Sequence, residues 1–188
     1  MPLKIEGKEV KVCLSRITIN MAVNIQLNGK IPTGVWTLYF HSPAEKKWSV
    51  DTFHKLGSVS TWAEYWGLVN GLEDAKWTRG MFFWMYGNVP PLWENFQNIK
   101  GGSYSMCISE TESIDIFHRY TIGCMLKVVT AGDDQIQGIT ISPKKGFQVI
   151  KIWNKDSSRF NKASGMAVLD KRINASEIRY MPHVEKKM

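Results

Sequence analysis

Residues 138–153 read GITISPKKGFQVIKIW and contain two candidate strands, GITIS and FQVIKIW, on either side of a loop with lysines. No helical pattern separates the two candidates. Strand candidates elsewhere in the chain are also not regularly interleaved with helices. A largely antiparallel sheet with helices on one face therefore fits this chain better than a parallel arrangement of alternating strands and helices.

Other strand candidates are short, often aromatic, and bounded by Gly, Pro or Ser. They are WTLYF from Trp36, WSVDTF from Trp48, RGMFFWMY ending at Tyr86, YSMCI and EIRYM. Helices are expected near 61–70, 113–130 and 158–172. Together these elements predict an α+β fold.

Length and composition predict one globular domain. The 188 residues are 44% hydrophobic and 22% charged, and no apolar run approaches the roughly 18 residues of a membrane span. The start, MPLKIEGKEVK, lacks the apolar core of a secretory signal. We therefore expect Cys13, Cys107 and Cys124 to stay reduced, in the cytosol or nucleus.

Charge and aromatic content suggest a class of partner. A net charge of +7 favours an anionic partner such as nucleic acid, although many basic proteins bind none. The eight tryptophans either fill a bulky core or grip flat ligands and apolar hot spots. We expect about half of them to be core residues.

The N-terminal residues form a section of their own. Residues 17–27 alternate between apolar and other residues, as in a half-buried strand, and Asn28-Gly29 indicates a turn. We therefore divide the chain into an N-terminal segment, 1–32, with an extra strand expected at 17–27, and a main domain, 33–188.

The first expected helix has clear ends and an apolar stripe. Thr61 and Glu64 form a capping box, and Asn70-Gly71 is a stop signal. Trp62 and Trp66 fall at the edge of the stripe. Each indole could cover the margin of the core or form the rim of a protein-docking patch.

Residues 90–102, PPLWENFQNIKGG, place Trp93 beside Glu94 behind two prolines. An indole face can stack on a planar base, and a carboxylate offers two acceptors that match the N1–H and N2–H donors of guanine. A cationic base would gain further from the indole face. The alternative for an isolated pair is a buried tryptophan next to a surface glutamate.

The order of these motifs resembles the translation initiation factor 4E family, which binds the 7-methylguanosine cap of messenger RNA. The series is WTLYF, the loop HSPAEKK before Trp48, TWAEYWGLVN, PPLWENF, GGSY and GITISPKKGFQVIKIW. The resemblance covers roughly residues 33–183. It implies a strongly curved, mostly antiparallel sheet with about three helices on its convex face, and a cap-binding domain at 33–188.

The resemblance also assigns roles to residues. Trp48 and Trp93 match the two tryptophans that sandwich the methylated guanine, and Glu94 matches the glutamate that reads its edge. Trp153 matches a third tryptophan near the N7 methyl group. Trp66, with Trp62 beside it, matches the convex site that takes a scaffold of the initiation factor 4G type or an inhibitor peptide.

The expected phosphate grip departs from the family pattern. Lys144 aligns with a phosphate-holding arginine, whereas the family's second phosphate lysine falls on Val149, which cannot serve. Lys151, on the same strand face, or Lys145, in the loop, could substitute. Two further differences are Ser103, where the family commonly has arginine, and KIPTGVW, which lacks the family's His-Pro pair. Lys100 is a further candidate cation for the phosphates, and His183 fits a family histidine near the cap.

The expected function is cap binding and scaffold recruitment in translation initiation, without a cofactor, a membrane or catalysis, in the cytoplasm and also the nucleus. A cap-cleaving hydrolase would need clustered carboxylates for Mg²⁺, and the adjacent acidic pairs, Glu73-Asp74 and Asp133-Asp134, fall in predicted turns. Two alternatives remain: a family variant that represses or sequesters particular messages, and a general single-stranded RNA-binding module.

Overall fold

The main domain is built on one seven-stranded sheet with the strand order β4-β3-β5-β7-β8-β6-β9, in which all neighbouring strands are antiparallel. We describe it from a computed structural model, which defines residues 4–5, 8–9, 27–130, 135–159 and 166–184. The strands are β3 (Trp36–His41), β4 (His54–Val59), β5 (Met81–Tyr86), β6 (Gly102–Ser109), β7 (Ile136–Lys144), β8 (Phe147–Asn154) and β9 (Arg179–Pro182). The predicted pair around the lysine loop is thus β7 and β8.

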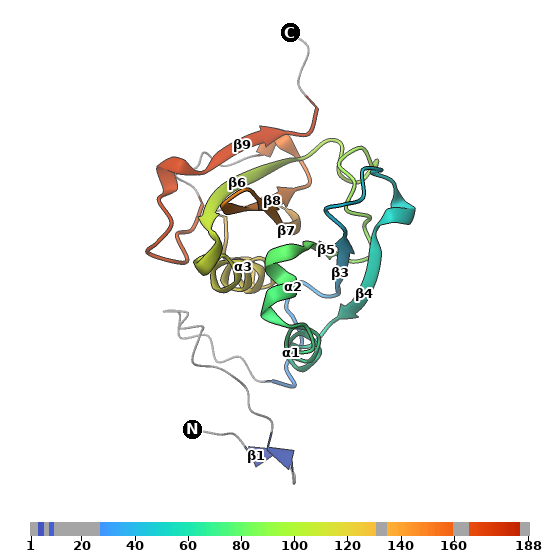
Figure 1. Ribbon diagram of the computed structural model, residues 1–188, viewed down its shortest axis with the longest axis vertical. Helices are drawn as coiled ribbons and strands as arrows, with labels where there is room; N and C mark the ends of the chain where they lie inside the picture. Colours follow the sequence, from blue (N-terminus) through green and yellow to red (C-terminus); the bar gives the residue numbers. More distant parts are fainter. Residues whose placement is uncertain (1–3, 6–7, 10–26, 131–134, 160–165, 185–188) are drawn as a thin grey trace.

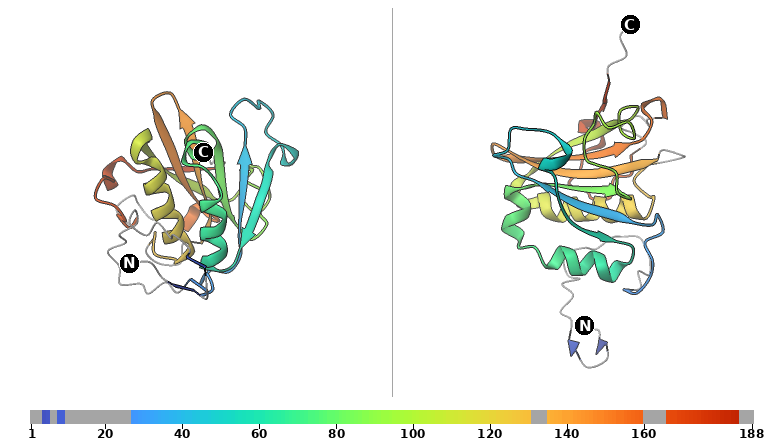
Figure 2. Two further views of the ribbon diagram at one scale, coloured as in Figure 1. Left: turned by 60° about the horizontal axis from the view of Figure 1, so that its bottom comes forward. Right: turned by 90° about the vertical axis from the view of Figure 1, so that its right-hand side faces the viewer.

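Helices lie together on one side of this curved sheet, below it in Figure 1 and again in the right-hand view of Figure 2. In the described ranges they are α1 (Trp62–Asn70), α2 (Asp74–Arg79) and α3 (Glu110–Met125). The α+β class, the curved antiparallel sheet and the helices on the convex face are confirmed.

Strand alternation divides the apolar side chains between the two faces of the sheet. On β5, Phe82 and Trp84 join the large cluster under the helices, whereas Phe83 and Met85 join a smaller one. The smaller cluster, which we call the concave cluster, consists of the buried residues Phe53, Phe83, Met85, Val89 and Trp153. The loops 42–53 and 87–101 both contribute to it, so both pack on the concave side.

One predicted strand is wrong. Trp48 to Phe53 is a loop with a 3-10 turn at Val50–Thr52, and the strand begins only at His54. Within the loop, Lys47 Nζ donates to Asp51 at 2.9 Å, and the Thr52 hydroxyl donates to the Ser49 carbonyl at 2.8 Å. Such local bonds compete with strand pairing.

The helix predicted at 158–172 is also wrong for the described part of that range. Ser157–Arg159 is a single 3-10 turn, and 166–172 contain no helix. Buried Met166 pairs with Thr130, and the Ala167 amide donates to the Val129 carbonyl at 2.9 Å. Backbone groups near Met166 therefore form hydrogen bonds with the chain after α3, and in a helix the same groups would bond to each other.

Helix α2 was missed, because its six residues are too few to show a helical period. It is held by Trp77, which is buried and packs 4.4 Å from the Phe82 ring, centroid to centroid. The helix expected at 113–130 is present as α3, with earlier limits at both ends.

The N-terminal segment contributes two short strands, β1 (Lys4–Ile5) and β2 (Lys8–Glu9), which pair with each other. The strand expected at 17–27 lies outside the described residues, except for Leu27. The Leu27 carbonyl accepts from the Ala63 amide at 2.7 Å, so the chain enters the main domain beside the start of α1. Among the described helices, none is long and apolar enough to cross a membrane.

Candidate functional site

The loop 42–53 holds Trp48 in a fixed orientation and leaves it accessible. Its indole stacks on the buried His41 ring with the centroids 4.3 Å apart and the planes 8° apart, yet the residue is 52% exposed. His41 Nε2–H donates to the Lys47 carbonyl at 3.1 Å, which fixes the imidazole plane. His41 therefore covers one face of the indole, and the exposed part can receive a flat ligand.

The same loop is stiffened by Asp51. Its carboxylate accepts from the Ser49 hydroxyl and from Lys47 Nζ. These two bonds, Ser49 first, lower the pKa of Asp51 to about 2. The carboxylate thus stays ionised and keeps the turn after Trp48 closed at neutral pH.

The loop 87–101 presents Trp93, 47% exposed, and the exposed Glu94. Fully buried Asn98 holds this loop from inside, because its Nδ2 donates to the Pro90 carbonyl at 2.9 Å and to the Leu92 carbonyl at 2.7 Å. The role of Asn98 was not predicted from the sequence. A polar residue inside a proline-bounded loop was the available signal, since loop amides often bond to nearby backbone groups.

The double glycine at the end of this loop is required by close backbone approach. A Cβ on Gly101 would lie 2.0 Å from the Asn154 carbonyl oxygen, and one on Gly102 would lie 2.3 Å from the Tyr180 hydroxyl. The Gly102 amide donates to Asn154 Oδ1 at 2.9 Å. Only glycine lets the loop return to the sheet between β8 and β9.

Trp153 and His183 join the loop 87–101 to the sheet. Trp153, at the end of β8, is buried in the concave cluster, and its ring packs edge-on against His183 with centroids 4.9 Å apart. His183 Nδ1–H donates to the Asn98 carbonyl at 2.8 Å. Through His183, the buried Trp153 at the end of β8 is thus linked to the loop that carries Trp93 and Glu94.

Opposite charges flank His183. Burial lowers its pKa; the bond to the Asn98 carbonyl opposes this, Lys151 lowers the pKa further, and Glu94 raises it. His183 is thus neutral at physiological pH, and it lies within electrostatic reach of both Glu94 and Lys151. The charges of Glu94 and Lys151 thus act on the same imidazole in opposite directions.

Strand register separates the three expected phosphate lysines. Lys151 faces Thr140 on β7 and Ser105 on β6, and by alternation it shares the concave face with Trp153. Lys144 lies four residues beyond Thr140, about 13 Å along the strand, and Lys145 follows it in the hairpin turn. Lys151 therefore lies on the same strand face as Trp153, whereas Lys144 and Lys145 lie at the hairpin tip.

Register also identifies a cation that sequence analysis missed. Ser105 pairs with Arg179 on β9, so Thr140, Lys151, Ser105 and Arg179 form one row across the concave face. Lys151 and Arg179 are two strands apart, which corresponds to about 10 Å between backbones. Ser103, in the neighbouring row beside Trp153, is buried and offers no charge.

On the convex side, the two tryptophans of α1 differ. Trp62 is 3% exposed and belongs to the core, which corrects the expectation that it lies at the rim of a docking patch. Trp66 is only partly buried, edge-on to the Tyr65 ring with centroids 5.1 Å apart. Helix α1 begins with the predicted capping box, in which the Glu64 carboxylate accepts from the Thr61 amide at 3.0 Å.

Comparison with protein families matches residues 33–187, more than four fifths of the chain, to the family described as Eukaryotic initiation factor 4E. The chain belongs to this family. The expected resemblance is confirmed.

Curated relatives of this family member are distant. Eukaryotic translation initiation factor 4E-1 of Triticum aestivum is 27% identical over 138 residues, covering 71% of the chain and 63% of the relative. Eukaryotic translation initiation factor 4E of Saccharomyces cerevisiae is 26% identical over 131 residues, covering 66% and 61%. The chain thus spans less than two thirds of the length of these relatives.

Solved structures support the fold of this family member. Ascaris suum eIF4E-3, in complex with m2,2,7G cap, has a TM-score of 0.67 at 18% identity, covering 87% of this chain and 95% of that one. Caenorhabditis elegans eIF4E-3, with the 4E-binding protein Mextli and cap analog, has a TM-score of 0.66 at 19% identity, covering 80% and 90%. At this identity the likeness concerns the fold.

Proposed function

We propose that the chain binds the 7-methylguanosine cap of messenger RNA between Trp48 and Trp93. One observation carries this proposal: two half-exposed indoles lie on separate stiffened loops that both pack on the concave cluster. Methylation at N7 makes the base cationic, so indole faces favour it over plain guanine. The cap complex of the Ascaris suum relative adds support by family membership.

In this proposal Glu94 accepts the N1–H and N2–H of the guanine and balances its charge. Trp153 forms the floor of the site and contacts the N7 methyl group. Lys151 and Arg179, in one row of the concave face, hold the phosphates nearer to the bound guanosine. Lys144 and Lys145 hold any phosphate that reaches the hairpin tip. The activity is binding without turnover.

Tryptophan fluorescence titration with 7-methylguanosine triphosphate and with GTP tests the site. Wild type should prefer the methylated nucleotide by at least about tenfold, and Trp93→Ala and Glu94→Gln should each weaken its binding by about tenfold or more. Phe96→Ala, an exposed aromatic on the same loop, is the matched control and should change it less than about twofold. Equal affinity for the two nucleotides would refute the proposal.

We further propose that α1 docks a scaffold or inhibitor peptide through Trp66, the partly exposed indole of the convex face. An indole on a helix surface is a common anchor for a partner protein. By recruiting a scaffold to capped messages, the protein acts in translation initiation. Its site of action is then the cytoplasm. The Caenorhabditis elegans relative is in complex with a 4E-binding protein, which supports this assignment by family membership.

Fluorescence polarisation with a labelled scaffold-type peptide tests the docking site. Trp66→Ala should weaken peptide binding by about tenfold or more, as expected for an interface hot spot. Asn70→Ala, an exposed change on the same helix, should leave it nearly unchanged. Peptide binding that survives Trp66→Ala would show that the peptide docks elsewhere.

A further inference from the structure

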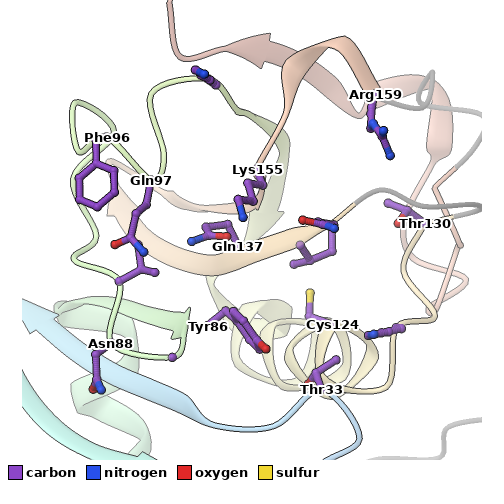
Figure 3. A pocket seen from close by; sticks show the side chains of 16 residues that line it. Thr33, Tyr86, Asn88, Phe96, Gln97, Cys124, Thr130, Gln137, Lys155 and Arg159 are labelled. Carbon is purple, nitrogen blue, oxygen red and sulfur yellow. The ribbon is translucent and has the colours of Figure 1, made fainter.

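A cavity borders both ends of the loop 87–101, and none of the residues that we propose to contact the cap lines it. Lys100, expected from the sequence as a further phosphate cation, lines this cavity instead. The cavity has a volume of about 1110 Å³ and is lined by the end of β5, the start of β7, the residues after β8 and the turn after α3. Ligand sites commonly range from about 300 to 1,000 Å³, so this cavity has room for more than one nucleotide. Figure 3 shows side chains from these separate segments around it.

Its lining is basic. Lys100, Lys127, Lys155 and Arg159 line it, and none of the described lining residues is Asp or Glu. Arg159 has an ion pair with Asp156 at 3.9 Å, and within the described part of the chain the three lysines have none. We call this cavity the basic pocket. The three lysines without an ion pair favour an anionic ligand.

Backbone contacts fix the relative position of these cations. The Lys155 amide donates to the Gln135 carbonyl at 2.9 Å, and the Ser157 amide donates to the Lys100 carbonyl at 2.8 Å. Lys100, from the loop 87–101, is thereby tied to the segment after β8 that carries Lys155 and Arg159. The charges are therefore held together by the fold.

Aromatic and amide groups complete the lining. Phe96 is 81% exposed and Tyr86 is 43% exposed, so both rings are available to a ligand. The Gln97 and Gln137 amides offer both donors and acceptors. Exposed rings with cations around them are typical of single-stranded nucleic-acid sites, where bases stack and phosphates meet lysine and arginine.

We propose that the basic pocket is a second RNA site, which binds a single-stranded segment independently of the cap. The cations contact phosphates, and Phe96 and Tyr86 stack on bases. A phosphorylated peptide would use the cations but would leave the stacking rings and the amides without a role. Both sites border the loop 87–101, which carries Trp93 and Glu94 for the cap and Phe96 with Lys100 for the RNA.

The test measures binding of an uncapped, 5′-hydroxyl decaribonucleotide in saturating 7-methylguanosine triphosphate and at several salt concentrations. The pocket variant combines Lys100→Gln, Lys155→Gln and Arg159→Gln. The control variant removes the same charge at exposed positions elsewhere, with Lys30→Gln, Lys76→Gln and Lys171→Gln. Circular dichroism and thermal melting check that each variant is folded.

We expect the pocket variant to bind RNA at least about tenfold more weakly and to lower the salt slope by about 2, since each single-strand phosphate contact contributes about 0.7. The control variant should stay within about twofold of wild type. Phe96→Ala should weaken binding by about tenfold through lost stacking, without changing the salt slope. Cap-analogue titration should be unchanged in all three.

Three results would overturn the proposal. They are no binding of the decamer by wild type, equal loss in the pocket and control variants, and competition by uridine monophosphate as strong as that by the decamer. The last would assign the basic pocket to free nucleotides. Since the cap titration is separate, failure here is distinguishable from failure of the cap proposal.

Discussion

The two faces of the sheet use aromatic residues in opposite ways. On the convex face, α1, α2 and α3 cover a large core in which Trp36, Trp77 and Trp84 are almost completely buried. On the concave face, the described buried apolar residues form the small concave cluster, and Trp48 and Trp93 are about half exposed on neighbouring loops. The convex face thus supplies stability, which allows the concave face to keep large apolar rings accessible.

Trp84 and Trp93 are the same residue type, but Trp84 is buried on the convex side and Trp93 is exposed on the concave side. Trp84, on β5, is fully buried and packs 5.4 Å from the Tyr65 ring of α1, centroid to centroid. Trp93 is about half exposed on a loop held by hydrogen bonds from Asn98. If the comparison is right, replacing them should have opposite consequences.

The largest expected effect is on stability. Trp84→Ala should lower the free energy of unfolding by about 3–5 kcal/mol, because it removes a large side chain from a packed core. Trp93→Ala should lower it by less than about 0.5 kcal/mol while abolishing most cap binding. Urea denaturation of both variants measures this, and similar losses of stability would break the comparison.

The next effect tests the support beneath the concave site. Asn98→Ala should cost about 1–3 kcal/mol, because the Pro90 and Leu92 carbonyls lose their partner. It should also weaken cap-analogue binding by loosening the loop of Trp93. Asn95→Ala removes only an acceptor for the Gln97 amide. It should therefore lower the free energy of unfolding, measured by urea denaturation, and the affinity for cap analogue, measured by titration, less than Asn98→Ala does.

A smaller effect sharpens the assignment of cations on the concave face. Lys151→Gln and Arg179→Gln should each weaken binding of 7-methylguanosine triphosphate about fivefold, the size of one partly solvated charge contact. Neither should affect 7-methylguanosine without phosphates. Lys145→Gln, at the hairpin tip, should change triphosphate binding less than about twofold. A larger loss of triphosphate binding in Lys145→Gln than in Lys151→Gln or Arg179→Gln would show that the phosphates bind at the hairpin tip.

The smallest effect is the pH dependence that His183 contributes. Burial lowers the pKa of His183 in the folded protein, so the unfolded chain binds the proton more readily. Stability should therefore be full above the unfolded value of about 6.5 and fall as the pH drops below it.

Urea denaturation at pH 7.5 and pH 5.5 should show this loss in wild type and a smaller one in His183→Gln. Asp51 and Asp170, whose pKa values are lowered to about 2, titrate in a more acidic range. An equal loss in both proteins would assign the pH dependence to other groups.

Much of the fold could be predicted because alternation and capping are local. The strands β3, β5, β7 and β8 and the start of α1 follow from residue pattern, since burial on two faces and the unpaired amides of a helix start act on neighbouring residues. The predictions at 48–53 and 158–172 were wrong where hydrogen bonds to the Asp51 carboxylate or contacts of Met166 replaced the regular pattern. Such contacts leave no period in the sequence.

The candidate site was predicted to a similar extent. Motif order supplied Trp48, Trp93, Glu94 and Trp153 by resemblance to a family that the chain is now shown to belong to. It did not supply Asn98 or Arg179, because their roles depend on a loop that folds back on itself and on strands distant in sequence. The apolar stripe left Trp62 either at the margin of the core or at the rim of a docking patch, and its ring lies in the core.

The sequence by itself determined the antiparallel sheet, the family and which tryptophans to suspect, because side-chain periodicity and motif order are properties of the chain. Only the tertiary structure decided which indoles are exposed, which cations share a row with Lys151, and that Lys100, Lys155 and Arg159 line one pocket. Exposure and proximity are set by strand register and by loops that pack on a common cluster, and these depend on contacts between residues far apart in the chain.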